Sequence, residues 1–352
     1  MSLNLRGILA AARKHNASDI HLLAGLPPML RINGDIVPLK GAANDAAALD
    51  ALMRECLNPA QLVRLETDWQ LCVSLTFPEI GRVRITVYRR GGNTEMCMRM
   101  SETTIRTREQ LGLPKVVDDL ARKPQGLVLV TGPTGVGKTT TFNYILDLIN
   151  SERSGKIVTI EDPIEYVHPM KRSIVVQQEL LTDVHDFSSA LRHVLRQDPD
   201  VIGIGELRDR DTIHTALVAA ETGHLVIGTL HTPGAADVVQ RLVSAFEPGQ
   251  QNEVRYLLAN TICGVVAQQL LPRAGGSGMV LAAEVLMETQ AVRHHIRENT
   301  LHQLYSEMQG GRKHGMQTLD HALEQLYQRG EITYDTAKSL SRNGDNLKLR
   351  AV

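Results

Sequence analysis

The chain has 352 residues, with 38 lysines and arginines against 39 aspartates and glutamates, and aromatic residues make up only 3% of it. The length predicts about two domains, and the ordinary hydrophobic and charged fractions exclude a fully disordered chain. A net charge of -1 and few aromatic side chains disfavour a surface that binds nucleic acid. We therefore expect no stable nucleic-acid partner.

The four cysteines form no C-x-x-C pair, which favours reduced thiols over a disulfide framework or a metal cluster. Every apolar run is shorter than the ~18 residues that a membrane-spanning helix needs. We therefore expect a cytoplasmic protein that has no membrane anchor of its own.

Residues 1–100 predict a small N-terminal α+β domain, because segments that alternate with period two outnumber the helical ones. Helical apolar stripes begin at Leu5 and extend over residues 46–65. Asn33 and Gly34 separate two short apolar segments, which is typical of a hairpin with a type I′ turn, and Pro38 makes the returning strand an edge. Further strands are expected at residues 70–77, 82–90 and 95–100.

Residues 101–125 carry two prolines and a broken apolar pattern, which predicts a linker or hinge with one short helix. After it, short apolar strands alternate with helical segments, as is typical of an α/β domain with a mostly parallel sheet. We expect this domain to span residues 126–289 and a helical C-terminal subregion to span residues 290–352. The clearest strands are residues 126–131, 156–160, 201–204 and 225–229.

Residues 132–139 match the phosphate-loop pattern G-x-x-x-x-G-K-[ST], between an apolar strand and an amphipathic helix. Such a loop surrounds phosphates with backbone N–H groups at a helix N-terminus. Lys138 is placed to reach the β and γ phosphates of ATP, and Thr139 to ligate Mg²⁺. The predicted nucleotide-binding residues are Gly132, Pro133, Thr134, Gly135, Val136, Gly137, Lys138, Thr139 and Thr140.

Carboxylates follow two of the predicted strands. Glu206 ends the strand at residues 201–204, and the ends of parallel strands meet at the edge that carries the phosphate loop, so Glu206 is the candidate Mg²⁺ ligand. Three acids follow the strand at residues 156–160, namely Glu161, Asp162 and Glu165. The alternative for these three is a solvated acidic turn.

His224 and His231 stand on either side of the apolar strand at residues 225–229. A histidine beside an apolar strand is more often a core residue whose ring nitrogens are hydrogen-bonded than a catalytic residue. Metal-ligand spacing such as H-E-x-x-H does not occur in the sequence.

Five ordered segments together resemble the secretion-type AAA-like ATPases, the superfamily of type II secretion and type IV pilus motors. Within it, the chain is most similar to the pilus retraction ATPases, the PilT-like twitching motility proteins. Residues 291–298 also resemble the A-I-R-x-x-I-R-E segment of the retraction subfamily. The five segments are an N-terminal signature at residues 16–22, the phosphate loop with its strand at 126–139, an aspartate box at 159–168, a Walker B region at 205–209 and a histidine box at 221–232.

The resemblance implies an N-terminal PAS-like α+β domain followed by a RecA-like P-loop ATPase domain. It implies that Glu165 acts on the attacking water, that Glu206 lies near Mg²⁺, and that His231 senses the nucleotide. His224 is at most a supporting residue. The family's N-terminal domain offers arginines to the phosphates, which assigns a possible catalytic role to Arg82, Arg84 and Arg99; the alternative is surface charge on a two-sided strand.

The resemblance further implies a homo-hexamer that hydrolyses ATP with Mg²⁺ and powers type IV pilus retraction. The implied partner is an inner-membrane pilus platform protein, so that the motor lies at the inner face of the cytoplasmic membrane and associates with it only through partners. Nucleotide would change the angle between the two domains about the hinge at residues 101–125. Residues 291–298 can form a short helix with Ala291, Val292, His295 and Ile296 on one side. Arg293, Arg297 and Glu298 are then expected to face solvent or a partner.

Other functions stay open at this point. Pilus assembly, effector secretion and conjugation are powered by ATPases with the same core motifs. A nucleic-acid motor needs a basic channel, which the near-zero net charge disfavours. A regulator that binds nucleotide without hydrolysis would lack an acidic catalytic position, whereas Glu165 and Glu206 are both present.

Overall fold

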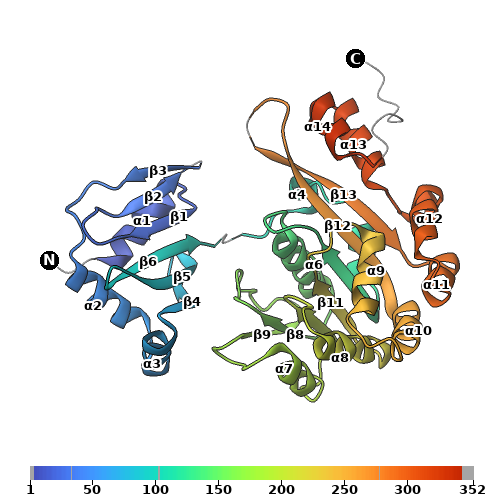
Figure 1. Ribbon diagram of the computed structural model, residues 1–352, viewed down its shortest axis with the longest axis horizontal. Coiled ribbons are helices and arrows are strands. Elements are labelled where there is room, and N and C mark those ends of the chain that lie inside the picture. Colours follow the sequence, from blue (N-terminus) through green and yellow to red (C-terminus); the bar gives the residue numbers. More distant parts are fainter. Residues whose placement is uncertain (1–3, 33, 102–103, 277, 343–352) are drawn as a thin grey trace. The chain divides into compact units, whose positions relative to one another are not determined.

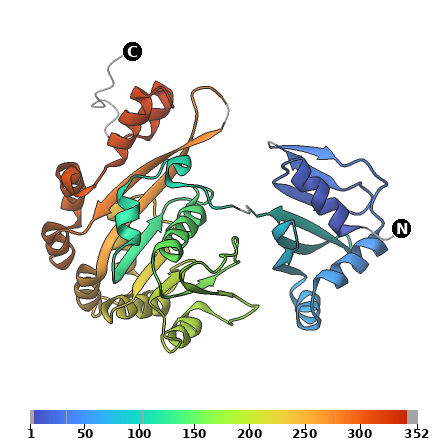
Figure 2. The same ribbon diagram turned by 180° about the vertical axis from the view of Figure 1, so that it is seen from behind.

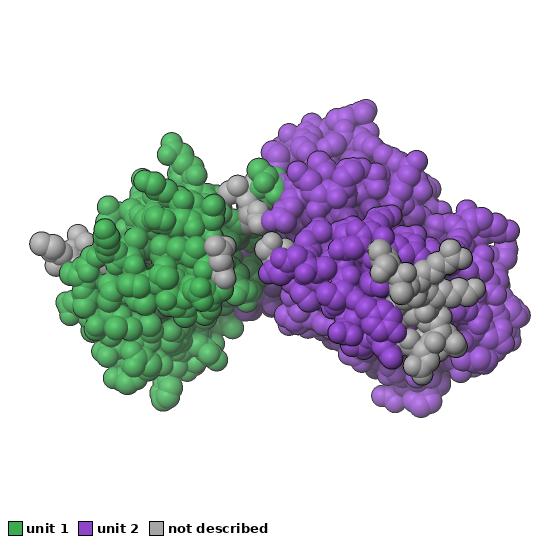
Figure 3. Space-filling view, turned by 90° about the horizontal axis from the view of Figure 1, so that it is seen from above, with its two compact units in different colours: residues 1–104, 163–167 green, residues 105–162, 168–352 purple. Residues whose placement is uncertain are grey.

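The computed structural model describes residues 4–32, 34–101, 104–276 and 278–342, and these form two compact units. Figures 1 and 2 show the ribbon from opposite sides, and Figure 3 shows the two units in different colours. Unit 1 contains the described residues up to Thr104 together with Pro163–Val167. Unit 2 contains the described residues from Ile105 to Asp162 and from His168 onward.

Unit 1 contains a six-stranded antiparallel sheet with the strand order β3-β2-β1-β6-β5-β4. Side chains along β5 alternate between the two faces of the sheet. Val83, Ile85 and Val87 are buried in a core shared with the helices. Arg82 and Arg84 lie on the opposite face. The elements are α1 (Leu5–Lys14), β1 (Asp19–Leu22), β2 (Met29–Ile32), β3 (Asp35–Pro38), α2 (Ala46–Cys56), α3 (Pro59–Asp68), β4 (Gln70–Phe77), β5 (Gly81–Arg90) and β6 (Asn93–Met100).

The predicted hairpin is confirmed, since β2 pairs with β3 and β3 is an edge strand that ends at Pro38. Gly34 has a φ of +98°, which only glycine adopts without strain, and Asn33 lies outside the described residues. The expectation of one helix over residues 46–65 is wrong. Asn58 caps a new helix there, with Pro59 as its first residue.

Unit 2 contains a seven-stranded sheet with the order β13-β12-β7-β11-β10-β8-β9. All neighbours are parallel except β12 and β13, which form an antiparallel pair. The strands are β7 (Gly126–Thr131), β8 (Lys156–Glu161), β9 (Ile174–Glu179), β10 (Val201–Ile204), β11 (Leu225–Thr229), β12 (Ile262–Pro272) and β13 (Met279–Met287). The four predicted strands are confirmed, and β9, β12 and β13 were not predicted.

The helices of unit 2 pack on its sheet around one large apolar core. Val117 and Leu120 of α5 are buried in this core, although the sequence predicted a linker there. The described part of the chain after β13, up to residue 342, is mostly helical and lies along β13 in orange and red in Figures 1 and 2, while residues 343–352 of the predicted helical subregion lie outside the described residues. The α-helices are α4 (Arg108–Leu111), α5 (Val116–Ala121), α6 (Lys138–Glu152), α7 (Phe187–Val194), α8 (Arg210–Glu221), α9 (Ala235–Ser244), α10 (Gln251–Thr261), α11 (Gln290–Arg297), α12 (Leu304–Gly310), α13 (Leu319–Gln328) and α14 (Tyr334–Leu340).

Two further observations concern the cysteines and the length of the helices. Cys56, Cys72, Cys97 and Cys263 are all free thiols. Within the part of the chain that the structure describes, every helix is too short or too polar to cross a bilayer.

The capping box at Asn58 yields the first prediction. The Asn58 side chain accepts a hydrogen bond from the Gln61 N–H at 2.9 Å, and the Gln61 side chain accepts one from the Asn58 N–H at 3.0 Å. Asn58→Ala should therefore lower the free energy of unfolding of unit 1 by about 1 kcal/mol in urea denaturation. Asp45→Ala is the matched control, because Asp45 precedes α2 without a side-chain cap bond. Equal losses for the two variants would contradict the capping role.

Candidate active site

The phosphate loop connects β7 to α6, as the sequence predicted. Gly132 has a φ of +138°, and a Cβ atom there would lie 2.4 Å from the carbonyl oxygen of Gln268, so only glycine fits. Gly137 precedes α6 in the left-handed conformation and offers no capping side chain. The first N–H groups of α6 are therefore available to an anion, as phosphate binding requires.

Lys138 is buried at the first position of α6, and its ammonium group makes three hydrogen bonds. The Nζ atom donates to the carbonyl oxygens of Gly132 at 2.8 Å and Pro133 at 2.9 Å. It also lies 3.1 Å from His231 Nδ1. Burial lowers the pKa of Lys138, and the negative charge of Glu206 acts in the opposite direction.

His231 links Lys138 to Glu206, since its Nε2 atom lies 3.3 Å from Glu206 Oε1. An ammonium group can only donate, so Nδ1 of the neutral ring must accept from Lys138. The ring proton then sits on Nε2 and is donated to the Glu206 carboxylate. Three residues from three different chain segments thus form one hydrogen-bonded row.

Arg208 extends this row, and the sequence analysis did not select it. Its Nη2 atom lies 2.7 Å from Glu206 Oε2, and its Nη1 atom lies 3.9 Å from Asp162 Oδ2. Burial raises the pKa of Glu206, but Arg208 and His231 outweigh that effect, so the pKa is lowered and the carboxylate stays ionised. The signal for Arg208 was its position two residues after Glu206, which puts both side chains on one side of an extended segment.

The row follows the topology of the sheet. Lys138 comes after β7, His231 after β11, Glu206 after β10 and Asp162 after β8, and these four strands are consecutive neighbours in the sheet. All four are parallel, so their carboxyl ends meet at one edge.

The donors at this edge suit Mg²⁺ in a phosphate site. Mg²⁺ is held there by one or two protein oxygens together with phosphate oxygens and water. Thr139 supplies a hydroxyl in the first turn of α6, and Glu206 supplies an ionised carboxylate. Among the described residues, no group of three His, Cys, Asp or Glu side chains is placed to hold a metal ion.

The aspartate box divides between the two units. Glu161 is buried in unit 2, where it accepts hydrogen bonds from Thr159 Oγ1 at 2.6 Å and Gln177 Nε2 at 2.9 Å. Glu165 belongs to unit 1, together with the three predicted arginines. Glu165 thus belongs to a different unit from Lys138 and Glu206.

Within unit 1, the arginines lie around the segment that carries Glu165. Arg82 Nε donates to the carbonyl oxygen of Ile164 at 2.6 Å. Desolvation raises the pKa of Glu165, and the charges of Arg84 and Arg99 act in the opposite direction. Arg99 also pairs with Asp19 at 2.9 Å. The catalytic roles of these residues stay predictions.

The other histidine has a structural role. His224 lies before β11, at the end of the strand opposite to His231, and its Nδ1 atom is 2.9 Å from the carbonyl oxygen of Ala219. It therefore closes the C-terminal end of α8 and is not part of the row.

Residues 291–298 form most of α11, whose buried side is Val292, His295 and Ile296, as predicted. The Arg293 side chain is 34% exposed, so part of it faces solvent as expected, but it also has a partner within the chain. Arg293 is ion-paired with Glu288, which also binds Lys123 at 2.9 Å. Glu288 directly follows β13 and lies five residues before Arg293, but the sequence pattern did not predict that the two would pair.

Comparison with known proteins decides the family. Residues 78–350 match the Type II/IV secretion system protein family. The chain belongs to this family. Among members of the Type II/IV secretion system protein family, it is 40% identical over 344 residues to the type IV pilus retraction ATPase PilT of Pseudomonas aeruginosa, covering 98% of this chain and 100% of the relative. It is 38% identical to the twitching motility protein of Neisseria gonorrhoeae, covering 99% of this chain and 93% of the relative.

The solved structure of the pilus retraction motor PilT with bound ADP matches this chain with a TM-score of 0.91 and 43% identity. The match covers 97% of this chain and 98% of that chain. The Legionella pneumophila ATPase DotB matches with a TM-score of 0.84 and 26% identity, over 96% of this chain and 94% of that chain. These matches confirm the PilT-like resemblance and the predicted fold class.

The row yields the second prediction, which concerns the proton of His231. In the neutral ring we expect the proton on Nε2, because Nδ1 accepts from Lys138. Lys138→Met removes the donor to Nδ1 and should allow the Nδ1–H tautomer to appear. Nitrogen-15 NMR of histidine-labelled protein measures this, with His231→Gln to assign the signal. Lys123→Met is the control and should change nothing. A proton on Nδ1 in the wild type would contradict the row.

Proposed function

We propose that this protein is an ATP-hydrolysing motor that powers type IV pilus retraction. The observation that carries the proposal is the match to the P. aeruginosa retraction ATPase over 98% of this chain and 100% of that protein. The type II secretion system protein E of the same organism, in contrast, is matched over only 53% of its length. The polar row at the sheet edge supplies the groups that such a reaction needs.

The phosphate loop binds the nucleotide through its backbone. The left-handed glycines let the chain curve closely, and the N–H groups at the start of α6 face the phosphates. Mg²⁺, held by Thr139 and Glu206, would neutralise charge on the β and γ phosphates. Because Arg208 and His231 keep Glu206 ionised, this carboxylate is ready to bind a cation at neutral pH.

Lys138 makes the link between phosphate binding and the histidine box. All three of its N–H donors are used, by Gly132, Pro133 and His231. A bond from Lys138 to a phosphate oxygen therefore replaces one of them. The contact with His231 is the longest, at 3.1 Å, so we propose that phosphate binding releases the ring and that this release is how His231 senses the nucleotide.

Glu165, Arg82, Arg84 and Arg99 complete the proposed mechanism. Glu165 orients the attacking water, and the guanidinium groups stabilise the charge that develops on the transferred phosphoryl group. We propose a homo-hexamer in which these residues act on the nucleotide of the same or a neighbouring subunit. Because α5 packs in the core of unit 2, the proposed hinge is the first part of residues 101–125, where unit 1 ends and unit 2 begins at Ile105. An inner-membrane pilus platform protein receives the motion.

The third prediction separates binding from hydrolysis. Lys138→Ala should lose nucleotide binding in isothermal titration and lose ATP turnover. Glu206→Gln should keep ATP binding, because the loop is intact, and lower kcat by about a hundredfold or more, because a charge that acts on the reacting phosphates is removed. Lys123→Ala is the control and should hydrolyse ATP normally. Loss of ATP binding in Glu206→Gln would contradict this division of roles.

The fourth prediction tests the direction of the motor in cells. A strain without the gene should carry excess surface pili and fail to twitch, and the wild-type gene should restore twitching whereas Glu206→Gln should not. Electron microscopy and a subsurface motility assay measure the two properties. Absence of pili in the deletion strain would instead show an assembly motor, and normal pili with normal twitching would exclude both.

A further inference from the structure

We infer that Glu284 is a positioning residue, which holds the loop that carries His231 at a fixed place relative to the C-terminal helices. The inference rests on the proposed function, because its effect is exerted on ATP turnover through His231. Neither the sequence motifs nor the phosphate site draws attention to this residue.

Glu284 lies on β13 and is only 3% exposed, yet it is a carboxylate in an otherwise apolar strand. Its two oxygens bind the first residues of two helices. Oε1 accepts from the Ala235 N–H at 2.7 Å, and Oε2 accepts from the Leu319 N–H at 3.3 Å. Ala235 begins α9 and Leu319 begins α13, so one buried side chain closes two helix N-termini.

The bond to α9 replaces a cap that the helix itself lacks. Its N-cap residue is Gly234, which has no side chain to accept a hydrogen bond. In contrast, α13 has its own cap, because the Thr318 side chain accepts from the His321 N–H. The start of α9 therefore depends on Glu284 more than the start of α13 does.

The start of α9 is also the end of the loop that carries His231. Only Thr232, Pro233 and Gly234 separate His231 from Ala235. This loop is held on its other side by Thr131 at the end of β7, whose Oγ1 donates to the Thr232 carbonyl oxygen at 2.6 Å. With so short a connection, a shift of Ala235 moves the imidazole away from Lys138 and Glu206.

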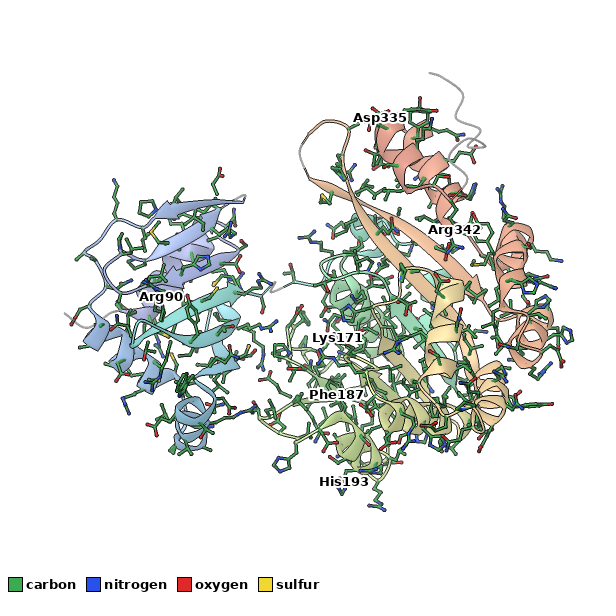
Figure 4. All side chains as sticks on the ribbon, in the orientation of Figure 1. Arg90, Lys171, Phe187, His193, Asp335 and Arg342 are labelled. Carbon is green, nitrogen blue, oxygen red and sulfur yellow. The ribbon has the colours of Figure 1, made fainter. Side chains whose placement is uncertain are left out.

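A second contact joins the C-terminal helices to the same turn of α9. Arg342, labelled in Figure 4, follows α14, and its Nη2 atom lies 3.5 Å from Asp237 Oδ2. Its guanidinium group lies 5.0 Å from the centre of the Tyr305 ring. Asp320 of α13 accepts bonds from Tyr305 and from the Arg342 N–H, both at 2.9 Å. The C-terminal helices thus contact the first turn of α9 through Glu284 and through Arg342.

The choice of a carboxylate at this position supports a role beyond packing. Burial raises the pKa of Glu284, and the N–H groups of Ala235 and Leu319 and the charge of Arg342 only partly offset the burial. An apolar side chain in β13 would avoid this cost of desolvation. What the carboxylate alone supplies is a pair of directional bonds that fix the two helices to each other.

The test is a double-mutant cycle on ATP turnover with the full-length protein. Glu284→Gln keeps the volume but cannot accept both N–H bonds. It should lower kcat about tenfold with KM for ATP changed less than about twofold, because small displacements of a catalytic group affect the chemical step. In a His231→Ala background, Glu284→Gln should change kcat by less than about twofold, since its effect passes through the missing ring. Glu288→Gln, also a paired carboxylate at the end of β13, should leave kcat unchanged.

The outcomes are distinct. The inference is overturned if kcat is unchanged in Glu284→Gln, or if the tenfold loss is the same with and without His231. The proposed function is overturned if the wild-type protein does not hydrolyse ATP. Thermal unfolding and sedimentation confirm that each variant is folded and assembled. If Glu284→Gln does not fold, Arg342→Ala decides, because it removes the surface contact to α9; its loss in kcat must likewise disappear in the His231→Ala background.

Discussion

The ammonium group of Lys138 has three N–H donors, and the arrangement of the side chains in the site depends on the acceptors that these donors bind. Two bind carbonyl oxygens of the phosphate loop and one binds His231. Because an ammonium group cannot accept, this arrangement sets the proton on His231 Nε2 and turns it toward Glu206. Arg208 then balances the carboxylate from its other side. One cation thus determines which nitrogen of His231 carries the proton, and His231 in turn donates to Glu206.

The sheet topology makes this row possible. Its members follow β7, β11, β10 and β8, which are adjacent in space although they are far apart in the sequence. The row is short and continuous, so a change at the phosphate loop reaches the histidine box directly. From there α9 leads to Glu284 and α13, which gives a physical path from the phosphate loop to the C-terminal helices.

Local patterns were enough to predict much of this site. The glycines, Lys138 and Thr139 form a contiguous motif, and Glu206 and His231 each follow an apolar strand, so strand order alone brings them together. Contacts that depend on packing could not be predicted. Glu284 acts through partners in α9 and α13, and Arg293 pairs with Glu288, which follows β13. Asn58 and Pro59 indicate a helix start between α2 and α3, but the apolar stripe continues across them, and the stripe was interpreted as one helix.

The most direct test of the account is a crystal structure of the protein with Mg²⁺ and a non-hydrolysable ATP analogue. The account predicts that Lys138 Nζ contacts a phosphate oxygen and no longer lies within hydrogen-bond distance of His231 Nδ1, while Glu206 stays bound to Arg208. A structure in which Lys138 contacts the phosphates and also keeps its 3.1 Å contact with His231 would contradict the account, because nucleotide binding would then leave the hydrogen bonding of His231 unchanged.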